Sequence, residues 1–301
     1  MPPFDGPYDI KINRRFFYGK MISISIMSFN EPKTIGKAIE SVINQSIDED
    51  YELVVSAPDE PTLSIARGYA SKNKRIKIFQ DPGKGKNYAI NLLLPKLKGD
   101  TLIFSDGDVY VSEGSINEIL KEFKNEKIGC VSGRPVPQET KNNQYGFWSH
   151  FLFDAAHNLR KKLKERGDFL ECSGYLYAYR NKVLESVPLH AGDDAIIPHL
   201  FWKKGYKIGY AENAKVFVKN ADNWNDWIKQ KVRTTKSHKT LSKYIDLKNS
   251  PKMKSFSNET SGIKDVMFYP KTLKEYYWME KLVLARLYMW ARVFYDTRLK
   301  D

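Results

Sequence analysis

The chain has 301 residues, of which 42% are hydrophobic and 28% are charged, and these values exclude wholesale disorder. Its two cysteines, Cys130 and Cys172, are too few for a disulfide scaffold or a cysteine-rich zinc site. The 49 Lys and Arg residues exceed the 36 Asp and Glu residues, and the net charge of +13 indicates an anionic partner: a nucleic acid, an anionic membrane or a phosphorylated substrate.

No apolar stretch approaches the ~18 residues that span a bilayer, and the N-terminus lacks the apolar segment of a signal peptide. We therefore expect a cytoplasmic protein, either soluble or bound peripherally to the cytoplasmic face of a membrane.

Short apolar runs alternate with amphipathic segments in the first third of the chain. The runs predict strands at residues 22–27, 51–55, 76–79 and 101–105. Helices are predicted from the start signal Asn30-Glu31-Pro32 to residue 43, and at residues 63–70 and 88–97. This alternation predicts an α/β fold with a mostly parallel sheet and helices on both faces. In such a sheet the ligand binds beyond the carboxyl ends of the strands.

The rest of the chain is less regular. Strands are predicted at residues 128–132, 169–179, 206–210 and 214–218. Helices are predicted at residues 145–164, 194–204, 224–244 and 273–298, and the polar residues 248–270 predict a loop.

The triplet Asp106-Gly107-Asp108 directly follows the fourth predicted strand. If the chain stays extended there, both carboxylates project to the same side. Such a pair suits a hard divalent cation that shares its coordination with substrate phosphates. The alternative is a surface turn, because Asp and Gly are common turn formers.

Segment 81–87 places two glycines and two lysines between a strand and a helix. Glycines let the backbone approach a ligand, Lys84 and Lys86 supply positive charge, and the helix N-terminus favours anions. The residue order differs from the Walker A motif, which argues against a P-loop ATPase. A solvated turn has a similar composition.

Two further polar groups lie on predicted helices. Asp193 and Asp194 follow Gly192 at a helix start, where a carboxylate either caps the helix or serves as a rigidly held catalytic group. Gln230 and Arg233 share a helix face, which is either a diphosphate-binding face or a solvated basic one. The scattered histidines and the lack of Gly-x-Ser-x-Gly and His-Glu-x-x-His motifs exclude serine hydrolases and zinc proteases.

Taken in chain order, these motifs resemble those of the family 2 inverting glycosyltransferases, which have a GT-A fold. Segment 24–31 is similar to the family's first strand and nucleotide-contacting loop, and segment 83–91 to its Gly-Lys-x-x-Ala-Leu-Asn motif. Asp106-Gly107-Asp108 matches the Asp-x-Asp metal motif. Segment 172–180 resembles the acceptor-side Ser-Gly segment, and segment 192–194 the Gly-Asp-Asp motif of hyaluronan- and chitin-type synthases. The likeness extends from about Met21 to about Arg233.

The resemblance implies a Rossmann-like GT-A catalytic domain and a nucleotide-diphosphate sugar donor, which we expect to be a UDP-sugar. It implies that Asp106 and Asp108 bind Mg²⁺ or Mn²⁺. Asp194, assisted by Asp193, would remove a proton from the acceptor hydroxyl and give a product of inverted configuration. Ser173 and Gly174 would contact the acceptor. The implied donor-binding residues are Ser28, Asn30, Glu31, Asp59, Lys84, Lys86, Asp106, Gln230 and Arg233.

Two departures from the family pattern bear on how the nucleotide base is recognised and on whether transfer is processive. Segment 56–60 replaces the paired aspartates that read the nucleotide base, and Asp59 or Glu60 is the candidate substitute. Thr234 follows Arg233 where processive members carry Trp, and the sequence has no transmembrane stretch through which a polymer could pass. We therefore expect non-processive transfer of one sugar, or a few, to a glycan or lipid-linked acceptor.

The sequence divides into an N-terminal extension (residues 1–20), a catalytic domain (21–222) and a basic helical C-terminal region (223–301) that completes the active site. The catalytic domain has a nucleotide-sugar half (21–110) and an acceptor half (111–222). Residues 229–254 carry nine Lys or Arg and one acid, a local charge of 9 − 1 = +8. Residues 273–298 mix Tyr, Trp and Leu with Lys and Arg, which fits a helix on an anionic membrane or one packed on the catalytic domain.

Three alternatives remain open. Basic charge with aromatic residues also fits a nucleic-acid-binding protein, but no zinc-finger or RNA-recognition signature is present and we expect no nucleic acid. A nucleotidyltransferase acting on a sugar phosphate would carry a glycine-rich loop after the first strand, and segment 28–31 has no glycine. An inactive relative would not need Asp106, Asp108 and Asp194 together.

Overall fold

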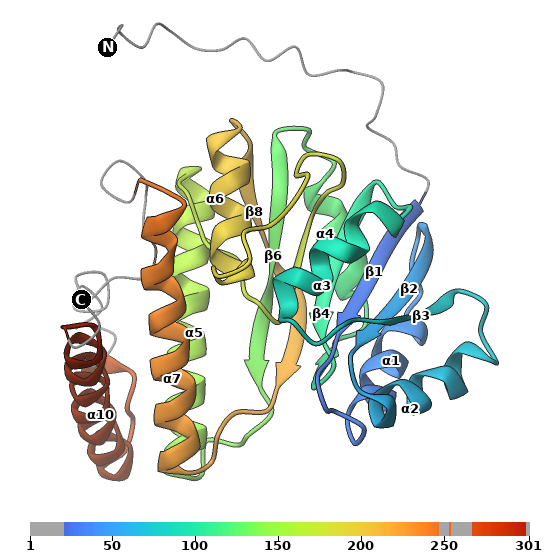
Figure 1. Ribbon diagram of the computed structural model, residues 1–301. Coiled ribbons are helices and arrows are strands. Elements are labelled where there is room, and N and C mark those ends of the chain that lie inside the picture. Colours follow the sequence, from blue (N-terminus) through green and yellow to red (C-terminus); the bar gives the residue numbers. More distant parts are fainter. Residues whose placement is uncertain (1–20, 247–252, 254–266, 299–301) are drawn as a thin grey trace, which may run out of the picture.

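The computed structural model describes residues 21–246, 253 and 267–298. These residues contain one mixed sheet of eight strands, in the order β3-β2-β1-β4-β7-β6-β8-β5, with helices on both faces (Figure 1). The expected α/β fold is therefore confirmed. The expected N-terminal extension, residues 1–20, lies outside the described residues.

The first half of the sheet is parallel, as expected. Its strands are β3 (Ile76–Gln80), β2 (Asp50–Ala57), β1 (Met21–Met27) and β4 (Thr101–Asp106). The helices between them are α1 (Ile35–Ile43), α2 (Glu60–Ala70) and α3 (Lys86–Leu93), and the 3₁₀ turn η1 (Leu94–Lys96) follows α3. Since these strands are parallel, their carboxyl ends meet at one edge of the sheet.

The second half of the sheet is mixed. β7 (Leu176–Arg180) lies antiparallel between β4 and β6 (Ile128–Pro137). β8 (Lys207–Val218) runs parallel to β6, and the edge strand β5 (Val109–Val111) runs antiparallel to β8. The helices are α4 (Ser115–Glu122), α5 (Gln144–Arg166) and α6 (Asp193–Lys203). Because β7 is antiparallel to β4, the start of β7 lies beside the carboxyl end of β4.

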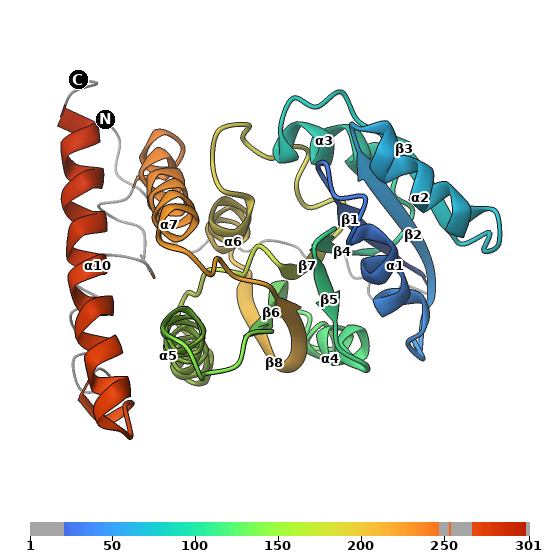
Figure 2. The same cartoon turned by 90° about the horizontal axis from the view of Figure 1, so that it is seen from below.

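Two apolar cores form on opposite faces of the sheet (Figure 2). The isoleucines of β1 point toward α1 and α4 and form one core with them. Helices α3 and α6 cover the other face, where Phe104 stacks on Tyr177 and Tyr179 with ring centroids 5.5 and 5.3 Å apart. The buried ends of α3 and α6 therefore have fixed positions relative to the strands that they cover.

The structure differs from the sequence prediction at several elements. The first helix begins at Ile35, because residues 31–34 form a hydrogen-bonded turn before it. Residues 169–175 lie outside any strand, so only the end of the predicted strand 169–179 is correct. The two strands predicted within residues 206–218 are one continuous strand, β8. Strand β5 and helix α4 are additional elements that lie outside the predicted strands and helices.

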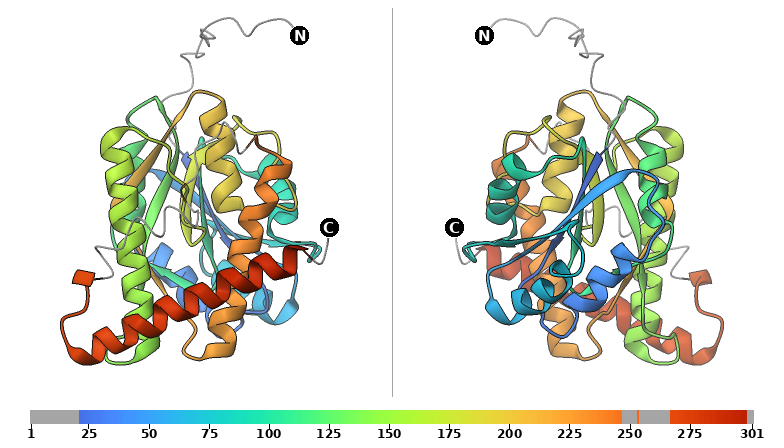
Figure 3. Two further views of the ribbon diagram at one scale, coloured as in Figure 1. Left: turned by 90° about the vertical axis from the view of Figure 1, so that its left-hand side faces the viewer. Right: turned by 90° about the vertical axis from the view of Figure 1, so that its right-hand side faces the viewer.

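The C-terminal region is helical, as expected. It contains α7 (Trp224–Lys239), the 3₁₀ turn η2 (Thr240–Lys243) and α10 (Leu273–Arg298). Figure 3 shows α10 lying across α5 and α7 on the outside of the molecule. Most of the predicted loop 248–270 lies outside the described residues. Among the helices that the structure describes, none is long and apolar enough to cross a membrane.

Candidate active site

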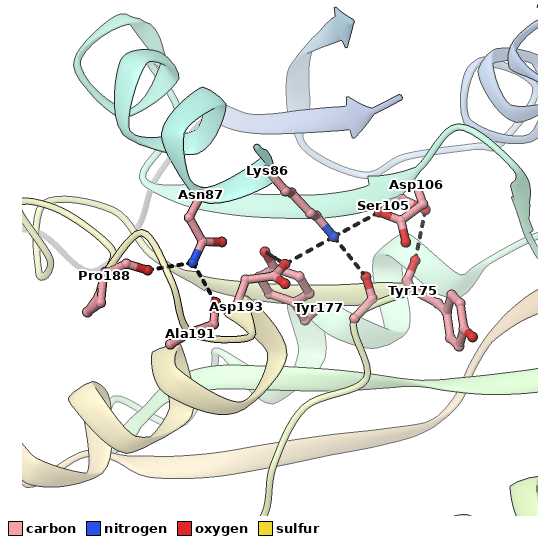
Figure 4. A network of polar contacts seen from close by, with 10 residues as sticks. Lys86, Asn87, Ser105, Asp106, Tyr175, Tyr177, Pro188, Ala191 and Asp193 are labelled. Carbon is pink, nitrogen blue, oxygen red and sulfur yellow. Dashed lines mark hydrogen bonds and ion pairs between the residues drawn. The ribbon is translucent and has the colours of Figure 1, made fainter. Parts of the chain in front are cut away.

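The polar motifs of the sequence meet at the carboxyl edge of the parallel strands. Ser28 follows β1, Asp59 follows β2, and Asp106 is the last residue of β4. The amino ends of α3 and α6 reach the same place and contribute Lys86 and Asp193 (Figure 4). The strand topology therefore assembles a site from segments that lie far apart in the sequence.

Lys86 joins the two halves of this site (Figure 4). Its Nζ donates to Asp106 Oδ1 at 2.8 Å and to the carbonyl oxygen of Gly174 at 3.3 Å, and lies 3.0 Å from Asp193 Oδ2. The Tyr177 hydroxyl donates to the same Asp193 oxygen at 2.7 Å. Burial lowers the pKa of Lys86, but Asp106 and Asp193 outweigh it and hold this pKa well above its usual value. The ammonium group is therefore always charged.

Asp106 and Asp108 flank a close approach between two loops. A Cβ on Gly107 would clash with the side chains of Ser28 and Glu31, so only glycine fits between the two aspartates. The chain turns at Gly107 rather than staying extended. The condition under which both carboxylates would project to the same side of a strand is therefore not met. The Asp106 side chain is partly buried by its ion pair, whereas Asp108 is exposed at the surface of the site.

Carboxyl groups crowd this part of the site and disfavour one another's charge. Burial raises the pKa of Asp106 to about 6, although Lys86 opposes the rise. Burial also raises the pKa of Glu31 to about 7, and the charges of Asp108 and Asp106 add to this rise. The pKa of Asp108 is raised as well, because protein atoms displace part of the water around it. A bound cation would relieve this repulsion.

The chemistry of this cluster fits a hard cation shared with a substrate. Carboxylate oxygens are the protein ligands that Mg²⁺ and Mn²⁺ prefer. Among residues 21–246, 253 and 267–298, no group of three or more His, Cys, Asp or Glu side chains could hold a metal. Asp106 and Asp108 alone are therefore too few for a closed metal site, and substrate oxygens and water would complete the coordination.

The loop after β1 is ordered by Asp59. The backbone N–H of Asn30, a residue with a positive φ of 56°, donates to Asp59 Oδ2 at 2.7 Å. The backbone N–H of Thr62 donates to Asp59 Oδ1 at 3.0 Å and caps α2. Partial burial acts against ionisation, but these hydrogen bonds outweigh it and lower the pKa of Asp59. Asp59 thus holds the loop in place, and its reading of the nucleotide base stays a prediction.

The segment after residue 172 reaches the second pair of aspartates. Gly174 lies directly beside Asp194, since a Cβ at Gly174 would be 3.6 Å from Asp194 Oδ2. The backbone N–H of Cys172 donates to the carbonyl oxygen of Asp194 at 3.0 Å, and that of Ser173 donates to Ser132 Oγ at 2.9 Å. The structure therefore places Ser173 and Gly174 next to Asp194, and their contact with an acceptor stays a prediction.

Asn87 links α3 to the loop that precedes α6 (Figure 4). This buried side chain donates from Nδ2 to the carbonyl oxygens of Pro188 and Ala191, at 2.6 and 2.8 Å. Asn91, one turn later, donates to the carbonyl of Val187 and accepts from its N–H. The first turns of α3 therefore hold the segment that leads into Asp193 and Asp194.

Helix α7 contributes to the edge of the site. Arg233 is exposed, and its charge lowers the pKa of Asp108, although burial of that carboxyl acts more strongly in the opposite direction. Gln230 lies one turn earlier, and its Oε1 is buried with no hydrogen-bond partner in the described part of the chain. A buried amide oxygen ordinarily has a donor, so Gln230 has a capacity that a ligand hydroxyl could satisfy.

The two lysines of the glycine-rich turn are equivalent in the sequence pattern, but they have different surroundings in the structure. Lys84 is exposed, with its Nζ 5.4 Å from the Tyr88 ring centroid, whereas Lys86 reaches both aspartate groups. Gly85, with a φ of 104°, begins α3 between them and turns Lys86 inward. Tyr175 and Tyr177 also lie among the carboxylates, where burial strongly raises the pKa of both phenol groups, and no sequence motif pointed to them.

Residues 23–187 match the family described as glycosyl transferase family 2, which accounts for more than half of the chain. The chain belongs to this family. Membership supports the glycosyl-transfer prediction over the nucleotidyltransferase alternative. The family resemblance drawn from the motifs is confirmed, and this glycosyltransferase carries each of those motifs at the edge of one sheet.

Relatives and solved structures agree with this assignment. The hyaluronan synthase of Streptococcus pyogenes is 22% identical over 259 residues, covering 78% of this chain and 59% of the synthase. The glycosyltransferase therefore spans about three fifths of that relative's length. A mannosyltransferase from Pyrobaculum calidifontis was solved with GDP-Man and Mn²⁺. It has a TM-score of 0.58 at 16% identity, and the match covers 91% of this chain and 75% of the mannosyltransferase chain. TarS 1–349 from S. aureus, solved with UDP-GlcNAc, has a TM-score of 0.51 at 14% identity, and the match covers 72% of this chain and 66% of the TarS chain. These structural likenesses show the shared fold.

Proposed function

We propose that this glycosyltransferase moves a sugar from a nucleotide-diphosphate sugar to an acceptor hydroxyl, with inversion at the anomeric carbon. The observation that carries the proposal is the position of Lys86, whose ammonium group contacts Asp106 on the donor side and Asp193 on the acceptor side. One cation thereby ties Asp106, an implied metal ligand, to Asp193, the residue that directly precedes the implied base Asp194 in the first turn of α6. Such fixed geometry is what a group transfer between two bound molecules requires.

The donor diphosphate would lie against Asp106, Asp108 and Arg233. Asp106 and Asp108 would hold Mg²⁺ or Mn²⁺, which would offset the negative charge that develops on the leaving diphosphate. Arg233 would add a planar guanidinium to the same phosphates, and its electrostatic effect on Asp108 supports this position. The orphan Oε1 of Gln230 would accept a hydrogen bond from a sugar hydroxyl.

Asp194 would act as the general base. It lies in the first turn of α6, and its carboxylate lies beside Gly174 of the acceptor segment. In the proposed step Asp194 takes the proton of the acceptor hydroxyl and that oxygen forms a bond to the anomeric carbon. The bond from that carbon to the diphosphate oxygen breaks, and the nucleoside diphosphate leaves on the opposite face. Asp193 is already paired with Lys86 and Tyr177, so its role is to position this turn.

The fold neighbours that bind UDP-GlcNAc and GDP-Man support a nucleotide-sugar donor, and we keep the UDP-sugar as the first choice. For the acceptor we propose a glycan or a lipid-linked saccharide, which receives one sugar or a few. Thr234 in place of the Trp of processive members supports the non-processive mode. We also propose that the enzyme works peripherally at a membrane surface, which the exposed apolar face of α10 supports.

The test is a matched pair of variants measured in two assays. Asp194→Asn should abolish transfer and still be stabilised by UDP-GlcNAc or GDP-Man with Mn²⁺, because the donor does not depend on the base. A donor at 100 times its dissociation constant adds about 2.7 kcal/mol of stability. Asp50→Asn is the control and should keep full activity, because Asp50 lies at the amino end of β2, away from the carboxyl ends of the strands where the site lies. Near-normal turnover by Asp194→Asn would assign the base to another residue.

Removal of the metal tests the role of Asp106 and Asp108. Excess EDTA should stop transfer, and Mn²⁺ or Mg²⁺ should restore it. Full turnover in excess EDTA would contradict the metal role of these aspartates. The anomeric configuration of the product, measured by NMR, tests inversion separately.

A further inference from the structure

Helix α10 has one face that the rest of the protein covers. This 26-residue helix packs on α5 and α7, as Figures 2 and 3 show. The indole N–H of Trp148 on α5 donates to the carbonyl oxygen of Trp278 at 2.7 Å. The buried side chains of α10 are Trp278, Met279, Leu282, Ala285, Met289 and Val293. The alternative of a helix packed on the catalytic domain is therefore correct for this face.

The opposite face of α10 is also apolar, and it faces solvent. More than half of the large apolar side chains exposed in the described part of the chain lie within residues 267–295. Leu273 is 90% exposed and Leu284 is 59% exposed. At 100° of rotation per residue, the exposed apolar side chains of α10 fall within a sector of about 140°, over a length of about 33 Å. We call this set the α10 strip: Leu273, Tyr276, Tyr277, Val283, Leu284, Leu287, Tyr288 and Tyr295.

Basic side chains border the strip along one edge. Lys274, Lys281 and Arg292 project within about 20° of one another at that edge. Lys274 Nζ lies 4.8 Å from the Trp278 ring centroid, and Lys281 Nζ lies 4.4 Å from that of Tyr277. Long basic side chains of this kind place their stems along apolar surface and their charges in a polar layer.

We propose that the α10 strip docks on an anionic phospholipid surface, with α10 lying flat in the headgroup layer. An apolar face with a basic border is the pattern of an interfacial helix, and such a helix binds anionic lipid through both features. Four of the eight strip residues are tyrosines, whose rings suit the boundary between hydrocarbon and water. The net charge of +13 adds a long-range attraction to the same surface.

A second copy of the chain is the competing occupant of the strip. In a symmetric dimer of strip against strip, the basic edges of both copies would be buried at or near the interface. Glu280 projects within the sector of the strip and is the exposed acid of the described part of α10, whereas Glu275 is only partly exposed. Two Glu280 side chains, one from each copy, would therefore face six basic edge residues. Charged groups left without partners in an interface are costly. A lipid surface instead supplies the negative charge, and it therefore matches the strip better.

Vesicle flotation with the full chain tests the proposal. At low salt, the wild-type chain should float with vesicles of phosphatidylglycerol and phosphatidylcholine. Each Lys or Arg near the surface contributes about a fivefold gain in affinity, so pure phosphatidylcholine should bind roughly 100-fold more weakly if the three edge residues all contribute. The double variant Leu284→Glu/Leu287→Glu should lose binding at least tenfold.

Ile65→Glu is the matched control, because Ile65 is also an exposed apolar side chain but lies on α2. This variant should float like the wild type, and all variants should keep the wild-type unfolding midpoint. Absence of flotation with anionic vesicles at low salt would overturn the proposal. Equal loss of binding in Ile65→Glu would also overturn it, as would a dimer in light scattering that only the strip variant dissociates. Flotation needs no substrate, so its failure would leave the transferase proposal intact.

Discussion

Replacement of Lys86 by methionine is the most direct perturbation of the site, because it keeps the length of the side chain and removes its charge. Lys86 Nζ lies 2.8 Å from Asp106 Oδ1 and 3.0 Å from Asp193 Oδ2, and 28% of the Lys86 side chain is exposed. Removing one partner of a fully buried ion pair costs about 3–5 kcal/mol. Because solvent screens part of this interaction, we expect a loss of about 2–3 kcal/mol in the free energy of unfolding near pH 8.

The loss should depend on pH. The pKa of Asp106 is raised to about 6 even with Lys86 present, so without the ammonium group it must rise further. A carboxyl group whose folded pKa is raised contributes stability that is present at low pH and lost as the pH rises through that pKa. The difference between Lys86→Met and the wild type should therefore be smaller near pH 5, where Asp106 is largely protonated in both proteins, than near pH 8.

Urea unfolding at the two pH values measures this difference, with Lys84→Met as the matched control. Lys84 is exposed two residues earlier in the same turn, so its replacement should change stability by less than about 0.5 kcal/mol. Lys86→Met should also lose most of its transfer activity, because Asp106 and Asp193 would no longer be held at one distance. The reasoning is refuted if the two lysine variants unfold at the same urea concentration at pH 8.

Two further outcomes are expected. Asn87→Ala removes two hydrogen bonds that hold the loop before α6, each worth about 1 kcal/mol. This variant should lower kcat about tenfold with little change in donor affinity. An unchanged kcat in steady-state assays would contradict this positioning role. Burial lowers the pKa of His199 to about 4. As the pH falls from 7 to 5, His199 is therefore protonated in the unfolded chain but not in the folded one, and the free energy of unfolding falls by about 2 kcal/mol. In urea titrations at pH 7 and pH 5, the His199→Leu variant should therefore lose less unfolding free energy on acidification than the wild type. An equal loss in the variant and the wild type would contradict this role of His199.

The parallel half of the sheet and the family could be predicted from the sequence alone. Strands β1, β2 and β4 are buried over almost their whole length, and their isoleucine, leucine and valine residues mark them as strands without a structure. The edge strand β3 is partly exposed, and its Ile76, Ile78 and Phe79 still mark it. The motifs that follow these strands had to lie near one another, because parallel strands end at the same edge. The long helix α10 was also evident from its pattern, since the expected and observed bounds agree.

Which residues contact one another within that site could be seen only in the folded structure. Lys84 and Lys86 are equivalent in the sequence, and only the left-handed backbone of Gly85 directs Lys86 to the aspartates. The antiparallel placement of β7 brings Gly174 to Lys86, 88 residues earlier in the chain, which no local pattern encodes. The amphipathic pattern of α10 likewise predicted a helix but not its two apolar faces, since burial depends on which neighbours the fold supplies. Local sequence fixes periodicity and strand ends, whereas contacts between distant segments depend on how the whole sheet is assembled.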